Sequence, residues 1–183
     1  MEQLDKILIN TIDNKYIELG LDKVDENCKF WKIRNFEGNA IGQIGEEFVK
    51  KIFEVYNLPN ENKKAIIHDE YDILSNGKKI EIKTARKGIK NHTFQFNGIN
   101  PIYNYDMVIL IGITYSGVFY TIISDRIIYE HNKRKYYINF GGRKKQLVSM
   151  NPGNTVNYKL TLSLKDLKPI DTFVEEISEL LQK

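Results

Sequence analysis

Asp72, Glu81 and Lys83 have the residue types and the spacing of a metal-assisted catalytic site. Asn76-Gly77 lies between two short apolar runs and predicts a two-residue type I′ hairpin turn, because both residues tolerate positive φ. This turn places Asp72 directly opposite Glu81. Since side chains alternate along a strand, Lys83 lies on the same face as the two carboxylates.

The predicted register extends through the hairpin. It pairs Ser75 with Lys78, Leu74 with Lys79 and Ile73 with Ile80. Asp69 and Glu70 lie just upstream, but only Asp72 comes into register with Glu81. Like charges directly opposite one another are destabilising, so the facing carboxylates require a cation. Their hard oxygen ligands suit Mg²⁺, and we expect Mn²⁺ to substitute for it.

Asp72, eight intervening residues and then Glu81-Ile82-Lys83 resemble the active-site signature of the PD-(D/E)XK nucleases, the superfamily of most type II restriction endonucleases. An upstream helix carrying Gly45-Glu46 and a downstream strand over residues 92–96 follow in the order that the family uses. The resemblance covers residues 38–125. Tyr71 stands where the family's pattern has proline.

The resemblance implies a restriction-endonuclease-like core, an α/β (α+β) fold with a central mixed sheet flanked by helices. Mg²⁺ would be held by Asp72, Glu81 and the Ile82 carbonyl. Lys83 would orient the attacking water or help to deprotonate it. The products would carry 5′-phosphate and 3′-hydroxyl ends.

Two further residues are implied to support the chemistry. Glu46 lies near the edge of the apolar stripe of its helix, where the family often has a glutamate that assists the metal site. Glu47 lies further round, toward solvent. Gln95 alternates away from the apolar face of its strand and, by the same resemblance, reaches the site from there.

Composition is that of an ordinary single globular domain. The chain has 183 residues, of which 42% are apolar and 28% charged. Cys28 is the only cysteine, which excludes an internal disulfide and favours a reducing compartment. With no apolar run of 18 residues and no signal-peptide pattern, we expect a cytoplasmic protein without a membrane segment.

Basic residues concentrate in the middle of the chain. Residues 71–145 carry 13 basic and five acidic side chains, a net charge of +8, whereas the whole chain has a net charge of +3. Such a basic centre favours a phosphate-backbone partner. Arg86, Lys87 and Lys90, in the loop that leaves the catalytic strand, are positioned to meet phosphates.

Residues 131–146, here called the basic ribbon, interleave six basic side chains with aromatics and Gly-Gly. This composition is typical of a segment that follows a nucleic-acid groove, with Lys and Arg supplying phosphate affinity. Arginine to guanine and asparagine or glutamine to adenine would supply base reading. The candidate residues are Arg134, Asn139, Arg143, Lys144 and Gln146.

The remaining elements are expected to position these residues. The apolar spacing predicts a packing helix over 3–19, a helix over 39–56 capped by Asn39, and a C-terminal helix that begins with a capping box at Thr172. Strands are expected at 105–113, 118–123 and 156–164, with a short helix from Asp125 and a short strand at 65–67. We expect one domain divided into 1–37, the catalytic core 38–125 and the DNA-contacting segment 126–183.

Together these patterns predict a Mg²⁺-dependent type II restriction endonuclease that cuts double-stranded DNA at a short sequence. A homodimer is expected because two strands must be cut, and a larger recognition subunit is the alternative. Two other functions stay open: a structure-specific repair or Holliday-junction-type nuclease, and a non-catalytic DNA-binding subunit. RNA also stays open as a substrate.

Overall fold

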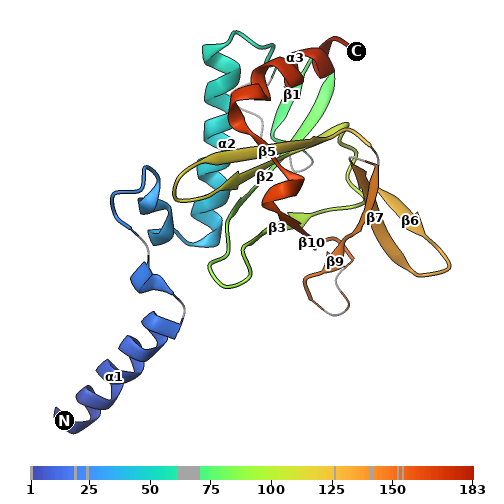
Figure 1. The fold of residues 1–183 in the computed structure, drawn as a ribbon. Helices are drawn as coiled ribbons and strands as arrows, with labels where there is room; N and C mark the ends of the chain where they lie inside the picture. Colours follow the sequence, from blue (N-terminus) through green and yellow to red (C-terminus); the bar gives the residue numbers. More distant parts are fainter. Residues whose placement is uncertain are drawn as a thin grey trace.

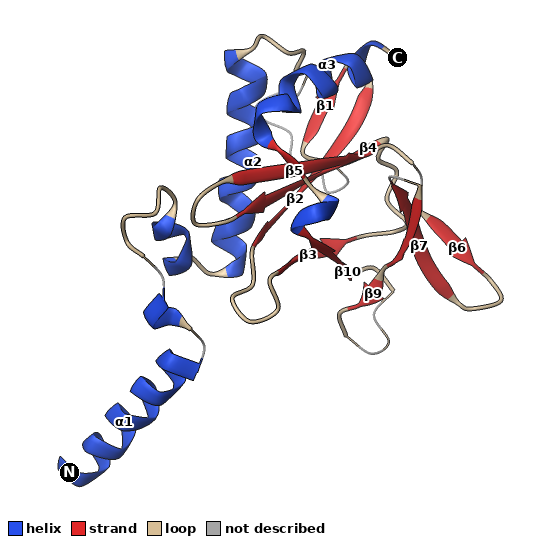
Figure 2. Cartoon of the chain, viewed as in Figure 1, coloured by secondary structure: helices blue, strands red, loops and turns tan. Residues whose placement is uncertain are grey.

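A mixed five-stranded sheet forms the centre of the molecule (Figures 1 and 2). The structure is a computed structural model that describes residues 2–18, 20–23, 25–61, 71–125, 127–140, 142–151, 153 and 155–183. In spatial order the strands are β1 (Ile73–Ser75), β2 (Lys78–Arg86), β4 (Met107–Ile113), β5 (Val118–Ile123) and β11 (Lys168–Pro169). Only β2 and β4 run parallel to each other. Every residue of β4 is buried, as expected for a central strand covered on both faces.

Two helices cover one face of this sheet, α2 (Gly38–Val55) and α3 (Phe173–Gln182). Their buried side chains pack against alternate residues of the sheet in one apolar core. This core includes Phe53, Phe173, Ile80, Ile82 and Ile109. Burying such side chains contributes about 1.5–3 kcal/mol each, so this face supplies much of the stability.

Strands cover the opposite face, and none of the described α-helices packs there. β3 (Thr93–Ile99), β10 (Tyr158–Ser163) and β9 (Val148–Ser149) form one three-stranded sheet, and β6 (Ile128–Glu130), β7 (Lys135–Phe140) and β8 (Arg143–Gln146) form another. Phe94, Phe96 and Leu160 bury their side chains against Ala85 and Leu110 of the central sheet. The α+β class is therefore correct, but the α-helices in the described part of the chain flank the central sheet on one face.

The N-terminal helix α1 (Glu2–Glu18) extends away from the rest of the chain (Figure 1). Leu8, Ile12 and Tyr16 have exposed fractions of 59%, 55% and 41%, so the expectation that they pack against a core is wrong. Helical periodicity identifies an apolar side, but it does not say what covers that side. Among the described residues no helix has both the length and the apolar character needed to cross a bilayer.

Three local expectations at element ends are wrong. The N-cap of α2 is Glu37, not Asn39, and it makes no side-chain cap bond. Thr172 does precede α3, but its hydroxyl bonds with the Pro169 carbonyl and the Tyr120 hydroxyl and does not cap the helix. The segment after Asp125 forms strand β6 instead of a helix. The strand expected at 65–67, like Asp69 and Glu70, lies outside the described residues.

The close packing of α2 on β2 depends on Gly45. A Cβ at this position would lie 2.6 Å from Cβ of Thr84, an atom that rotation of the threonine side chain cannot move. Gly42, one turn earlier on α2, has nothing within 4 Å of a Cβ. Two glycines in the same helix therefore have opposite structural roles.

We predict that Gly45→Ala lowers the free energy of unfolding by about 1–3 kcal/mol, because helix and strand must separate. Gly42→Ala should raise it by roughly 0.5–1 kcal/mol, because alanine loses less backbone entropy in a helix. Urea denaturation of both variants measures the difference. Equal effects at the two positions would contradict this packing.

Candidate active site

The hairpin that carries the predicted site forms with the expected register. Ile73 pairs with Ile80, and the other two predicted pairs also form. Asn76 and Gly77 have φ values of 49° and 72°, as a type I′ turn requires. The pairs that form end at Ile73 and Ile80, and the predicted pairing of Asp72 directly opposite Glu81 is not among them. The amide of Asp72 instead donates to the carbonyl of Ile80 at 2.9 Å, which holds Asp72 beside this end of the hairpin.

The Asp72 carboxylate takes the place of a backbone carbonyl on the edge of β2. Its Oδ2 accepts a hydrogen bond from the Ile82 amide at 2.7 Å. The N–H and C=O groups of a strand residue point to the same neighbour in an antiparallel ladder. The carbonyl of Ile82 therefore faces the edge where Asp72 lies, as a metal ligand there requires.

Glu81 and Lys83 form an ion pair along one face of β2. Both side chains are largely buried, with 12% of Glu81 and 22% of Lys83 exposed. Burial is the main cause that raises the pKa of Glu81 to about 7, and the negative charges of Asp72 and Glu46 raise it further. The positive charge of Lys83 acts in the opposite direction and lowers it. The three acids and the lysine therefore share one electrostatic environment.

Glu46 reaches this environment from α2. Its side chain is half-buried and lies 3.8 Å from Lys50. Burial and the charge of Asp72 raise its pKa, and Lys50 and Lys83 oppose this increase. Glu47 is exposed, as the helical stripe predicts. The structure thus brings the predicted Glu46 to the site and leaves Glu47 outside it.

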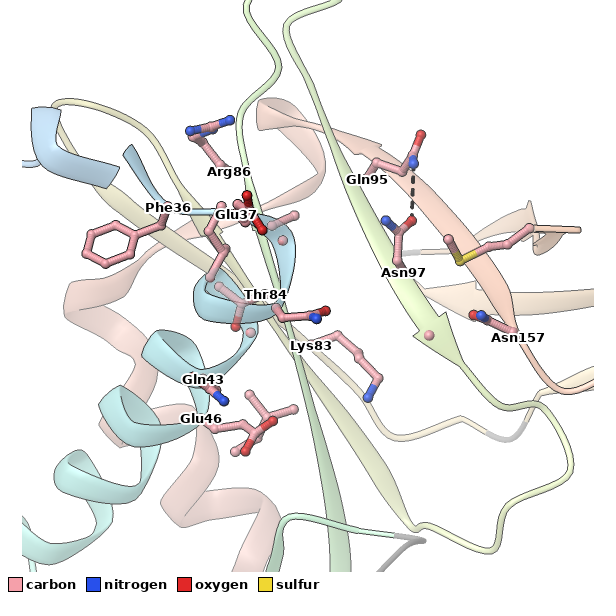
Figure 3. Close-up of a pocket in the computed structure, with 18 residues that line it drawn as sticks. Phe36, Glu37, Gln43, Glu46, Lys83, Thr84, Arg86, Gln95, Asn97 and Asn157 are labelled. Atoms are coloured by element: carbon pink, nitrogen blue, oxygen red, sulfur yellow. Dashed lines mark hydrogen bonds between the residues drawn. The ribbon is translucent and has the colours of Figure 1, made fainter. Parts of the chain in front are cut away.

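A cleft of about 810 Å³ opens along β2, between α2 on one side and β3 on the other (Figure 3). It begins where β1 ends, since β1 pairs with β2 only as far as Ile80 and no other described strand pairs with that edge. Glu46, Lys83 and Gln95 line the cleft. Asp72 and Glu81 lie beside it and are not among its lining residues.

Sequence reasoning missed several polar residues of this cleft. Asn97, Gln43 and Asn157 line it together with Gln95. The signal for Asn97 was present, because it follows Gln95 at the two-residue spacing of one strand face. Gln43 and Asn157 come from other elements, and only the folded chain brings them here.

The donor set fits Mg²⁺. Within the described ranges no group of three or more His, Cys, Asp or Glu side chains is close enough to hold a metal ion. Mg²⁺ requires fewer protein ligands, since it binds through one or two carboxylates and keeps several waters. The burial of Glu81 beside Asp72 makes its ionised form costly, and a cation would relieve that cost. Asp72, Glu81 and the Ile82 carbonyl are the groups suited to hold it.

Of the three basic residues predicted for the loop after the strand, Arg86 is instead the last residue of β2, and Lys87 and Lys90 follow it. Nη1 of Arg86 donates to the carbonyls of Ile33 and Arg34 at 3.0 and 2.7 Å, which ties β2 to the 3₁₀ helix η2 (Trp31–Asn35). Lys90 pairs with Glu18 of α1 at 3.1 Å. Lys87 lines a separate cavity of about 330 Å³. Arg86 and Lys90 therefore have structural partners in addition to their predicted role.

Many polar side chains of the basic ribbon have partners, either within the ribbon or on the neighbouring acids Glu130 and Asp166. Lys144 pairs with Glu130 and lies over the ring of Tyr137. Gln146 accepts a hydrogen bond from Lys135 at 3.3 Å. Arg134 is exposed in the β6–β7 turn, and Asn139 is half-buried on β7. These contacts leave fewer side chains directed outward than the composition suggested.

Arg143 of the ribbon is bound to a buried acid. It lies 3.1 Å from Asp166, which also accepts bonds from the amide and hydroxyl of Ser163. Although burial opposes ionisation, these hydrogen bonds and the charges of Lys145 and Arg143 lower the pKa of Asp166. The contact anchors the ribbon to the turn after β10.

Comparison with protein-family models, curated proteins and solved structures finds no match to this chain. The function is therefore inferred from the chemistry of the site alone.

The raised pKa of Glu81 makes stability depend on pH. Unfolded glutamate titrates near pH 4.3, so between about 4.3 and 7 the folded protein holds a proton that the unfolded chain releases. Stability therefore falls as the pH rises through this window. We predict that Glu81→Gln raises the free energy of unfolding by about 1–3 kcal/mol at pH 8 and changes it little at pH 4.

Urea denaturation without divalent metal at the two pH values tests this prediction. Glu47→Gln, an exposed carboxyl on α2, is the matched control and should have the same small effect at both pH values. If Glu81→Gln is no more stable than the parent at pH 8, then the ionised Glu81 carboxylate does not lower the free energy of unfolding, and the prediction is wrong.

Proposed function

We propose that this protein is a Mg²⁺-dependent endonuclease that hydrolyses phosphodiester bonds of double-stranded DNA at a short specific sequence and leaves 5′-phosphates. The observation that carries the proposal is the convergence of Asp72, Glu81 and Lys83 on the end of one hairpin, beside a cleft that Glu46 also lines. The basic charge of the central segment supports a polyanionic substrate.

Each residue has a distinct part in this chemistry. Mg²⁺ held by Asp72, Glu81 and the Ile82 carbonyl would supply Lewis acidity and activate water. Lys83, an ammonium beside Glu81, donates N–H groups to a phosphate oxygen or to the attacking water. Glu46 has a raised pKa and lies across the cleft edge, so it is suited to accept the proton of that water.

Cutting both strands of a duplex requires two active sites or two successive cuts by one. We therefore propose a homodimer, with a larger recognition subunit as the other arrangement. A cytoplasmic location agrees with a single cysteine and with DNA as the substrate.

A structure-specific nuclease is the second candidate function, and the basic ribbon favours it. Lys144, Arg143 and Gln146 are engaged with neighbouring side chains, which reduces the surface left for reading a sequence. A nuclease that recognises a branch or a damaged site requires less base reading than a restriction enzyme.

The test is incubation of the purified protein with Mg²⁺ and a sequence-diverse duplex, followed by sequencing of the ends. We predict cleavage that EDTA abolishes, and a loss of at least about 100-fold in Asp72→Asn, Glu81→Gln and Lys83→Ala, because each removes a group at the reacting phosphate. Lys51→Ala, on the exposed side of α2, is the matched control and should cut like the parent.

Discrete fragments that share one motif would establish sequence-specific cleavage. Cutting of branched DNA alone would favour the structure-specific nuclease, and cutting of duplex RNA alone would change the substrate. DNA binding without metal-dependent cutting of any substrate would favour the non-catalytic subunit and refute the catalytic assignment.

A further inference from the structure

Two exposed amides form a hydrogen-bonded pair on the wall of the cleft. Nε2 of Gln95 donates to Oδ1 of Asn97 at 3.1 Å, and both side chains lie on the face of β3 that is turned away from the core. Figure 3 shows the pair across the cleft from α2, with Lys83 extending from β2 toward the same space. We call these two residues the amide pair.

The amide pair retains both kinds of hydrogen-bonding group. A primary amide has two N–H donors and two acceptor lone pairs, and the mutual bond uses one donor of one side chain and one lone pair of the other. If both amides are flipped, the mutual bond still uses one donor and one lone pair. The remaining donors and acceptors are therefore the same whichever way nitrogen and oxygen are assigned. The pair therefore presents adjacent donors and acceptors to the cleft.

A β-bulge aligns the amide pair with the catalytic strand. β3 contains one residue more than β10 between the pairs Tyr158–Ile99 and Leu160–Phe96, and Gly98 has a φ of 76°. Bulges bend a strand and redirect its side chains, and they are frequent beside active sites. A Cβ on Gly98 would lie 3.9 Å from Cε of Lys83, so the bulge brings the backbone after Asn97 close to the catalytic lysine.

The opposite wall leaves space for a ligand. Gly38 and Gly42, on successive turns of α2, both line the cleft, and a Cβ at either position would have no neighbour within 4 Å. The cleft is thus wider at these two positions of α2, where the helix has no side chain beyond Cα, than at its neighbours Gln43 and Glu46. A nucleotide strand is therefore able to lie between α2 and the amide pair.

We propose that the amide pair is a base-reading element that selects adenine beside the cleaved phosphate. Adenine presents an N6 donor next to an N7 acceptor in the major groove, which is the pattern that asparagine and glutamine amides complement. The position next to Lys83 places the recognised base near the cut. This inference rests on the proposed function, and it assigns reading to Gln95 and Asn97 of the cleft in place of the basic ribbon.

The first test selects bound duplexes from a randomised pool in EDTA, so that binding is measured without cleavage. The parent protein should enrich a motif containing adenine. Asn97→Ala should reduce the preference for adenine at one position by about 5- to 150-fold, the discrimination expected of one bidentate contact. Asn14→Ala, an exposed amide on α1, is the matched control and should select the parent motif.

A chemical probe separates base reading from a structural role of the amide. Replacing the selected adenine by 7-deazaadenine removes the N7 acceptor and leaves the rest of the base. This replacement should weaken binding by the parent protein about tenfold or more and leave the affinity of Asn97→Ala unchanged, because the two changes remove the same contact. Asn97→Asp should shift the preference toward cytosine, whose N4 donates to carboxylates.

Two results would overturn the base-reading role. One is an unchanged motif in Asn97→Ala and Gln95→Ala, and the other is equal 7-deazaadenine losses in parent and Asn97→Ala. If the parent cuts at a motif that changes only in Arg143→Ala or Lys144→Ala, the ribbon reads the sequence and the proposed function stands. Absence of any DNA binding or cleavage by the parent would refute both proposals.

Discussion

The hydrogen bond from the Ile82 amide to the Asp72 carboxylate determines how the site is arranged. β1 supplies backbone partners to β2 only as far as Ile80, and the carboxylate then occupies the next acceptor position. An acid is thereby held at the edge of a strand without a further strand to cover it. The same edge of β2 is open to the cleft. The candidate site therefore begins at the point where the pairing of β1 with β2 ends.

The site is built at a cost in stability. Glu81 is largely buried, and its pKa of about 7 reflects that burial together with the repulsion of Asp72 and Glu46, which the charge of Lys83 only partly offsets. An arrangement selected for folding alone would place an apolar residue there. Acids beside a cleft whose pKa values are raised by burial and by one another are instead typical of sites that use their charge, which links the electrostatics of this strand to the proposed chemistry.

The two faces of the central sheet have different roles, one in the apolar core and the other in the candidate site. α2 and α3 pack on one face and supply an apolar core, while β3 crosses the other and carries the amide pair toward Lys83. The basic ribbon forms ion pairs with Glu130 and Asp166, two acids that flank it in the folded chain. Its composition resembles a binding segment, yet several of its basic side chains are paired with these two acids.

The sequence alone determined the hairpin, because Asn-Gly sets the turn locally and the register follows by counting. It also determined the helical stripe of α2 and the buried strand β4, since their apolar periodicity is a property of neighbouring residues. Tertiary structure decided that α1 stands exposed, that Arg143 meets Asp166, and that Asn97 reaches the cleft. These outcomes depend on contacts between residues far apart in the chain, and local patterns carry no record of which distant partner a side chain will meet.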